Sequence, residues 1–266
     1  MRHKSLITSI LLCFFTFANA QNKSGLIIYD IKYPNENLKA KTVESRLFFN
    51  DTLSIGISYS SKFFIQKDVG INQEREGIGM TFEYGDEKGE VIYRNFNTEK
   101  IILRFPKSAA IDEYTVEDTW LKIKWEIKEE MLLIGKFKCK KAIGDFRGRT
   151  YIVWFTEEIP LPYGPFKLYG LPGLILEAED TEKMFSVKMK SIEYPTNQEF
   201  EINEPIEKEK KTLREHVYSQ DHIEDLLLEK LNSKVPKGIR FTKDPNKIDS
   251  KRAYKAEKVY EWEKLQ

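Results

Sequence analysis

The chain has 266 residues, of which 41% are hydrophobic and 32% charged, and its 43 basic residues nearly balance its 42 acidic ones. This composition excludes a disordered acidic chain and a basic nucleic-acid-binding protein, and it predicts a chain that folds. Two cysteines and three histidines exclude a disulfide framework and a multi-cysteine metal cluster, so we expect no metal and no cofactor.

The first twenty residues have the three parts of a secretory signal peptide. Basic residues precede an apolar run from Leu6 to Phe17, and Ala18-Asn19-Ala20 supplies the small residues before a predicted cleavage at Gln21. The apolar run, of about 12 residues, is shorter than the roughly 20 that a membrane-spanning helix needs. We therefore expect an exported protein, periplasmic or secreted, that has no transmembrane anchor and keeps Cys139 as its only thiol.

Alternating apolar and polar residues predict strands through the first half of the mature chain. These strands are expected at Ile27–Tyr33, Ile55–Tyr59, Met80–Tyr84, Val91–Arg94 and Ile101–Phe105. The turn-rich residues 85–89 separate the third strand from the fourth, which predicts a hairpin.

Further strands are predicted at Leu121–Ile127, Leu133–Cys139, Thr150–Phe155, Leu174–Ala178 and Phe185–Ile192. Residues 144–148 are typical of a turn and predict a second hairpin. Eight to ten strands at hairpin spacing predict a mainly β fold with one continuous antiparallel sheet, curved into a half-barrel or bowl, or closed.

The chain changes character after Pro205, because residues 206–266 carry 12 acidic and 15 basic residues and are too polar to form a second core. Apolar residues at helical spacing predict one or two peripheral helices between Leu213 and Asn232, ended by Pro236-Lys237-Gly238. We expect a signal peptide at 1–20, a β-rich domain at 21–205 and a charged, partly helical segment at 206–266 that packs on the sheet or extends from it.

Several spaced motifs carry a resemblance to a known family. They are the hexapeptide Gly170–Ile175, the strand Ile92–Arg94, the stretch Gly135–Ala142, the turn Phe146–Arg149 and the run Trp154–Pro160. Over roughly Ser24 to Tyr194 the chain resembles the GLPGLI family of exported Bacteroidetes proteins, which implies an exported β protein without an established activity. It is similar, more distantly, to the bowl-like β domain at the N-terminus of a secreted glycan-releasing amidase, and in general shape to LolA-like half-barrels that hold lipids. These resemblances imply a concave sheet without a catalytic apparatus.

The loop from Gly164 to Gly173, which contains the hexapeptide's first residues, has two interpretations. Its prolines and glycines could shape a plug whose apolar side chains fill one end of the sheet. Alternatively, the loop is a rim or lid over an apolar cavity, and its aromatic side chains touch a ligand or partner. The candidate ligand- or partner-contacting residues are Tyr163, Phe166, Lys167, Tyr169 and Leu171 of the loop region, together with Trp125.

No complete catalytic constellation is visible in the sequence, so no residue is assigned a catalytic role. Cys139 lies far along the chain from His216 and His222, and a buried, inert thiol is the simpler interpretation. Paired carboxylates could serve a hydrolase if two of them met across a cleft. The candidates for such a pair are Glu157, Glu158, Glu177 and Asp180.

The leading hypothesis is therefore an exported, non-enzymatic binding or accessory protein of the cell envelope. It would hold an apolar small molecule, a glycan, a peptide or an envelope protein at a concave β-sheet, and it would bind no nucleic acid. The alternative is a secreted, carboxylate-dependent hydrolase that acts on glycans or peptides. A third hypothesis is a structural protein that pairs with a partner through an exposed strand edge.

Overall fold

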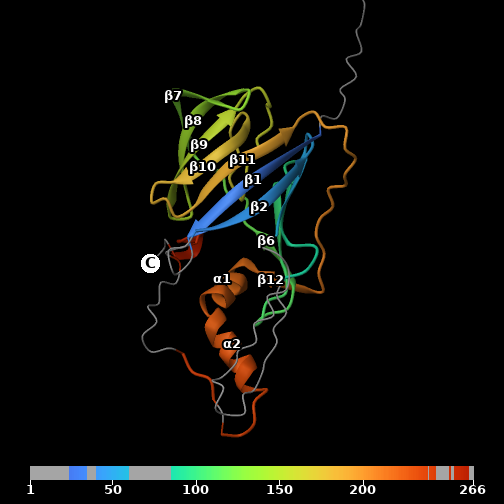
Figure 1. Cartoon of the computed structure of the whole chain (residues 1–266), viewed down its shortest axis with the longest axis vertical. Coiled ribbons are helices and arrows are strands. Elements are labelled where there is room, and N and C mark those ends of the chain that lie inside the picture. The colour runs from blue at the N-terminus through green and yellow to red at the C-terminus, as the bar shows by residue number, and fades with distance from the viewer. Residues whose placement is uncertain are drawn as a thin grey trace, which may run out of the picture.

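Twelve strands form one sheet in the computed structural model of the protein (Figure 1), which describes residues 24–34, 40–59, 85–238, 240–243, 252 and 255–263. The predicted signal peptide and the predicted strand Met80–Tyr84 lie outside the described residues. Within the described ranges, no helix is both long enough and apolar enough to cross a bilayer.

The strands of the first half are β1 (Gly25–Pro34), β2 (Ala40–Phe49), β3 (Leu53–Ser58), β4 (Glu90–Asn95), β5 (Lys100–Phe105) and β6 (Tyr114–Asp118). Those of the second half are β7 (Trp125–Ile134), β8 (Phe137–Phe146), β9 (Arg149–Thr156), β10 (Leu174–Asp180), β11 (Ser186–Glu193) and β12 (Glu209–Thr212). The helices are α1 (Leu213–Asp221), α2 (Ile223–Asn232) and the short 3-10 helix η1 (Glu261–Glu263).

The sheet is open, with the strand order β12-β6-β5-β4-β3-β2-β1-β11-β10-β9-β8-β7. Its neighbouring strands are antiparallel except for β12, which pairs in parallel with β6. The first strand of the chain lies in the interior of the sheet, because β1 pairs with β2 on one side and with β11 on the other. A mainly β fold with C-terminal helices confirms the predicted fold class.

Alternation along the strands places the core on one face of the sheet. On β9, Tyr151, Val153 and Phe155 are fully buried while the residues between them are half-buried. Because successive side chains of a strand point to opposite faces, these residues share a face. They pack in one cluster with the inward residues of β1, β2, β8, β10 and β11.

The observed strands differ from the predicted ones in a few places. The turn at Arg147-Gly148 confirms the predicted hairpin, but the single strand predicted at Leu133–Cys139 is wrong. The chain turns at Gly135, whose φ of +57° glycine adopts more readily than other residues do, and this turn divides β7 from β8. Strands β2, β6 and β12 were not predicted, and the strand expected from Leu121 begins only at Trp125.

Helix α1 covers the β5–β6 end of the sheet. It begins with a capping box, in which Thr212 and Glu215 satisfy each other's main-chain N–H groups. Leu213 and Val217 of α1 pack with apolar residues of β5 and β6 and with Tyr260, which forms a second core cluster. The segment 255–263 therefore returns to the body of the protein after the helices (Figure 1).

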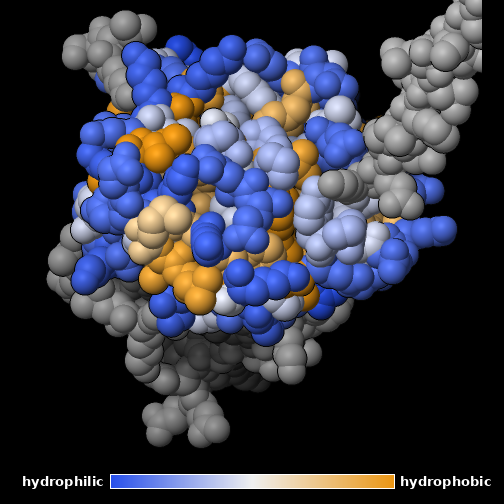
Figure 2. Space-filling model, turned by 90° about the horizontal axis from the view of Figure 1, so that it is seen from above, coloured by the Kyte–Doolittle hydropathy of each residue, from blue (hydrophilic) through white to orange (hydrophobic). Residues whose placement is uncertain are grey.

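The face of the molecule seen in Figure 2 is largely hydrophilic, with separate hydrophobic patches. Among the described residues, the edge strand β7 carries four of the large hydrophobic side chains that are exposed, namely Ile127, Met131, Leu132 and Leu133.

Candidate functional site

The segment between β9 and β10, residues 157–173, packs against the inward face of the sheet. Tyr163, Tyr169 and Leu171 are at most 3% exposed and belong to the two core clusters. The hydroxyls of both tyrosines donate hydrogen bonds to main-chain carbonyl oxygens, at 2.8 and 2.6 Å. The loop thus fills much of the concavity, as the plug interpretation expects.

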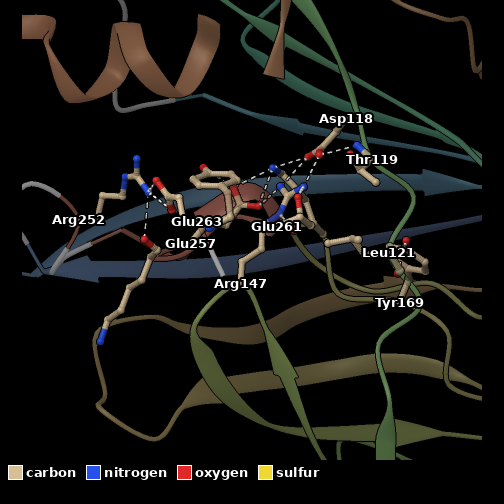
Figure 3. Close-up of polar contacts among 12 residues, drawn as sticks. Asp118, Thr119, Leu121, Arg147, Tyr169, Arg252, Glu257, Glu261 and Glu263 are labelled. Carbon is tan, nitrogen blue, oxygen red and sulfur yellow. Dashed lines mark hydrogen bonds and ion pairs between the residues drawn. The ribbon is translucent and has the colours of Figure 1, made fainter. Parts of the chain in front are cut away.

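A buried ion cluster anchors this loop to the C-terminal segment (Figure 3). The Lys167 Nζ lies 2.7 Å from Asp118 Oδ2 and 2.8 Å from Glu257 Oε2. Arg147, from the β8–β9 turn, donates to Asp118 at 2.6 Å and to Glu261 at 3.0 Å, and it also pairs with Glu257. Two cations and three carboxylates therefore join the loop, the end of β6, the β8–β9 turn and the segment 255–263.

The electrostatics of this cluster favour its charged state. Burial alone would raise the pKa of Asp118, but Lys167 and Arg147 outweigh burial and hold that pKa well below its usual range. Burial alone would lower the pKa of Arg147, but the carboxylates around it raise it instead. Removal of a single member of such a buried cluster is expected to destabilise the fold, because the remaining charges would be left without a partner.

A cavity of about 240 Å³ lies between strands β1–β4 and the turn formed by Gly164, Pro165 and Phe166. The side chains and glycine that line it from the sheet are Ile31, Tyr33, Val43, Ser45, Leu47, Gly56, Ser58, Glu90, Ile92 and Arg94. Most of these residues are apolar or small, and a single cation and a single carboxyl group stand among them.

The cavity exists because β3 offers it no large side chain. Strand β3 contributes only Gly56 and Ser58 to the lining that the structure describes. Gly56 pairs with Leu47 of β2 and with Ile92 of β4. A Cβ added at Gly56 would lie 3.8 Å from Leu47 Cδ1 and 3.9 Å from the Ile92 carbonyl oxygen, so it would meet only ordinary contacts. A larger side chain at this position would project into the cavity.

Arg94 lines the cavity with hydrogen-bond donors that do not all have an acceptor. Its side chain is fully buried, and its Nη1 donates to Ser54 Oγ at 3.3 Å. In the part of the chain that the structure describes, its Nε and Nη2 have no hydrogen-bond partner. Burial lowers the pKa of Arg94 to about 10, which still leaves the guanidinium charged at neutral pH. The sequence places Arg94 at the end of a predicted strand and in a family motif, and it does not indicate Arg94 as a site residue.

The structure places the predicted ligand-contacting residues in different environments. Phe166 lines the cavity and packs on Phe185, with ring centroids 5.5 Å apart. Lys167 is engaged in the ion cluster, and Trp125 Nε1 donates to the Tyr169 carbonyl oxygen at 2.8 Å. A role in ligand contact stays a prediction for all six residues, and Phe166 is the one that borders the cavity.

Three of the four carboxylates considered for catalysis interact with basic side chains or with the main chain. Glu157 pairs with Lys140 at the surface, and Glu158 Oε1 accepts a hydrogen bond from the Lys138 main chain. Asp180 is buried and pairs with Arg149 at 2.5 Å, while the half-buried Glu177 lies three residues before it on β10.

Cys139 and His216 are both buried, in separate core regions. Burial raises the pKa of the Cys139 thiol to about 11, so the thiol is protonated at neutral pH. His216 lies on α1, stacks on Phe105 with ring centroids 4.2 Å apart, and its Nδ1 is 2.9 Å from Tyr114 Oη. Among the described residues, no three metal-binding side chains gather into a group.

His216 is expected to make the folded state sensitive to mild acid. Burial, assisted by Lys167 and Lys255 and opposed by Asp118, lowers its pKa from 6.5 to about 3. Below about pH 6.5 His216 therefore binds a proton in the unfolded chain but not in the folded chain. The free energy of unfolding falls as the pH falls toward 3. The expected slope from this residue is up to about 1.4 kcal/mol per pH unit.

A His216→Phe variant should reduce this slope when the free energy of unfolding is measured in urea between pH 7 and pH 4. Phenylalanine keeps an aromatic ring against Phe105 and removes the titrating group. His222→Phe is the matched control, because His222 is less buried, and it should retain the wild-type slope. Equal slopes in wild type and His216→Phe would contradict the prediction.

The described residues define an open, curved β-sheet protein whose concavity is largely filled by the loop 157–173, with a small cavity beside β1–β4. Residues 146–177 match the model of a family described as "Protein of unknown function (Porph_ging)". This match confirms the predicted resemblance to the GLPGLI-type family, over a stretch that holds the hexapeptide as well as Arg147 and Lys167. No curated protein sequence matches the chain.

Among solved structures, two crystal forms of PNGF-II, an amidase, are similar to this chain, with TM-scores of 0.47 and identities of 14% and 16%. The similarity covers 77% of this chain but 32% and 33% of PNGF-II, so the chain spans about a third of that protein. A domain described as an outer membrane lipoprotein-sorting protein, from Vibrio parahaemolyticus, has a TM-score of 0.23 and 9% identity, over 66% of this chain and 87% of that domain.

Proposed function

We propose that the protein is an exported, non-enzymatic binding protein of the cell envelope that holds a small, largely apolar molecule in the cavity between β1–β4 and Phe166. The observation that carries the proposal is the cavity itself, in a sheet whose core is otherwise filled by the loop 157–173. Protein interiors are close-packed, and a mostly apolar hollow with a few polar groups on its lining is the default hypothesis for a ligand site.

The residues that line the cavity are better suited to binding an apolar ligand than to catalysing hydrolysis. Ile31, Leu47 and Ile92 offer apolar walls, and burying an apolar ligand against them removes its surface from water. The four carboxylates considered for hydrolysis are not on the lining, and the carboxyl group that is there belongs to Glu90. The proposal therefore favours capture of a ligand over the hydrolase alternative.

Native mass spectrometry of the protein purified from the cells that make it would test this function. Wild type should carry a small-molecule adduct that disappears after extraction with organic solvent. Gly56→Leu should carry little or no adduct, because the leucine side chain projects into the space that the ligand needs. Ile57→Leu is the matched control, since the neighbouring position points to the opposite face of β3, and it should carry the wild-type adduct.

Two outcomes would contradict the proposal. An adduct retained equally by Gly56→Leu and wild type would place the ligand elsewhere on the protein. A wild type that carries no adduct and takes up no octanol when the alcohol is added would show that the cavity does not hold apolar molecules.

A further inference from the structure

The ligand cavity contains a buried guanidinium that lacks an anion. Arg94 is 0% exposed, yet its Nε and Nη2 find no acceptor among the described residues. The Tyr169 ring lies 6.0 Å from Arg94 Cζ, a cation–π contact that offsets part of the cost of burying this charge but accepts no hydrogen bond from Nε or Nη2. A residue in this state therefore indicates a group that arrives from outside the described chain.

The neighbouring phenols do not supply the missing negative charge. Tyr29, Tyr163 and Tyr169 lie around the guanidinium, and burial raises the pKa of each, that of Tyr169 to about 12. All three are neutral at physiological pH. Each hydroxyl also donates its proton to a main-chain carbonyl oxygen, at 2.6 to 2.8 Å.

The carboxyl group of Glu90 also lines the cavity, but it does not lie beside the guanidinium. Glu90 precedes Arg94 by four residues on β4 and shares its face, so the strand rise separates their Cα atoms by about 13 Å. No ion pair joins the two among the described residues. Glu90 is half-buried while Arg94 is fully buried, which places Arg94 at the deep end of the cavity. Burial raises the pKa of Glu90, which weakens its repulsion of an entering anion.

The free atoms of Arg94 have the geometry that a carboxylate requires. Nε and Nη2 lie on one edge of the planar guanidinium and form a two-pronged donor, whereas the atom already bonded to Ser54 is Nη1. Two parallel N–H bonds to the two oxygens of a carboxylate are the usual match for such an edge. Leu47 and Ile92 line the cavity at the register positions between Arg94 and Glu90, so apolar side chains separate this edge from the Glu90 carboxyl group.

We propose that the ligand is a monocarboxylate with an apolar body, whose acid group pairs with Nε and Nη2 of Arg94 at the deep end of the cavity. This inference rests on the proposed function. The apolar body lies along β1–β4 toward Phe166. The protein is thus selective for the acid over an uncharged or cationic molecule of the same shape.

Three probes that share one alkyl chain test this assignment at pH 7, with affinities measured by isothermal titration calorimetry. Octanoate should bind wild type at least tenfold more tightly than octanol, and octylammonium should bind more weakly than octanol, because Arg94 repels it. Arg94→Met should lower the octanoate affinity at least tenfold, to that of octanol, and should leave octanol binding unchanged. Arg94→Lys keeps the charge without the two-pronged edge and should recover only part of the preference.

A second readout separates a binding role from a structural one. Without ligand, Arg94→Met should melt at or above the temperature of wild type, because methionine removes an unpaired buried charge. If Arg94 were needed for folding, the variant would melt well below wild type, and the inference would be overturned.

The outcomes distinguish this inference from the proposed function. Equal binding of octanoate and octanol by wild type would overturn the acid assignment and leave the apolar cavity in place. Failure of both probes to bind would overturn the proposed function as well. Retention of the acid preference by Arg94→Met would show that another group recognises the acid and would also overturn the assignment.

Discussion

An Arg147→Met variant is expected to lose about 3–5 kcal/mol of its free energy of unfolding. The substitution leaves Asp118 and Glu257 buried with a single cation, Lys167, and leaves Glu261 without its partner from the β8–β9 turn. Methionine fills much of the volume of arginine, so the loss comes from the uncompensated carboxylates rather than from a cavity. Urea unfolding followed by tryptophan fluorescence would measure the change.

The control for this variant is Arg46→Met, which breaks the exposed pair with Glu44. Exposed pairs contribute roughly 0–1 kcal/mol, so the control should stay close to wild type. The pH profile gives a second check, because the pKa of Asp118 is held below its usual range. The stabilisation from Asp118 is then complete above about pH 4 and is lost only as the pH falls further. Equal losses in Arg147→Met and Arg46→Met would show that the ion cluster does not anchor the C-terminal segment.

A Gly173→Ala variant is expected to lose at least about 3 kcal/mol, and to melt about 6–12 °C below wild type. Gly173 is the second glycine of the hexapeptide, and its Cα lies flush against the main chain at the end of β9. An added Cβ would lie 2.1 Å from the Thr156 carbonyl oxygen and 3.0 Å from the Glu157 nitrogen. Main-chain atoms cannot rotate away as a side chain can, so the strands themselves would have to separate.

Differential scanning calorimetry of Gly173→Ala beside Gly56→Ala would check this expectation. At Gly56 a Cβ meets ordinary contacts at 3.8 and 3.9 Å, and loss of glycine's freedom in the unfolded chain should make that variant neutral or slightly more stable. If both variants melted near wild type, close packing would not be the reason for glycine in the motif.

The strands that sequence reasoning found are those with apolar residues at every second position, such as Ile27–Ile31 and Tyr151–Phe155. Strand β12 could not be found in this way, because its residues Glu209–Thr212 are all polar and, among the described strands, it pairs only with its parallel neighbour β6. Strand β2 does alternate, but Ser45 interrupts its apolar face at the place where the cavity lies.

The site was harder to predict than the sheet. The loop 163–173 was identified as important, but sequence could not show that Lys167 turns inward, since its partners Asp118 and Glu257 are 49 and 90 residues away. Arg94 did leave a local signal, a lone cation at an inward position of an apolar strand. That signal has meaning only once the strand register shows which face is buried.

The central position of β1 has a consequence for the order in which the chain can fold. The first strand completes its hydrogen bonding only when β11 has been synthesised, because Ile27 pairs with Ile192. The ion cluster forms later still, because Glu257, a partner of Arg147, lies 110 residues downstream of it. Contacts so distant in sequence are typical of slow folders. The chain therefore cannot complete the hydrogen bonding of β1 or close the ion cluster until residues far downstream have been made.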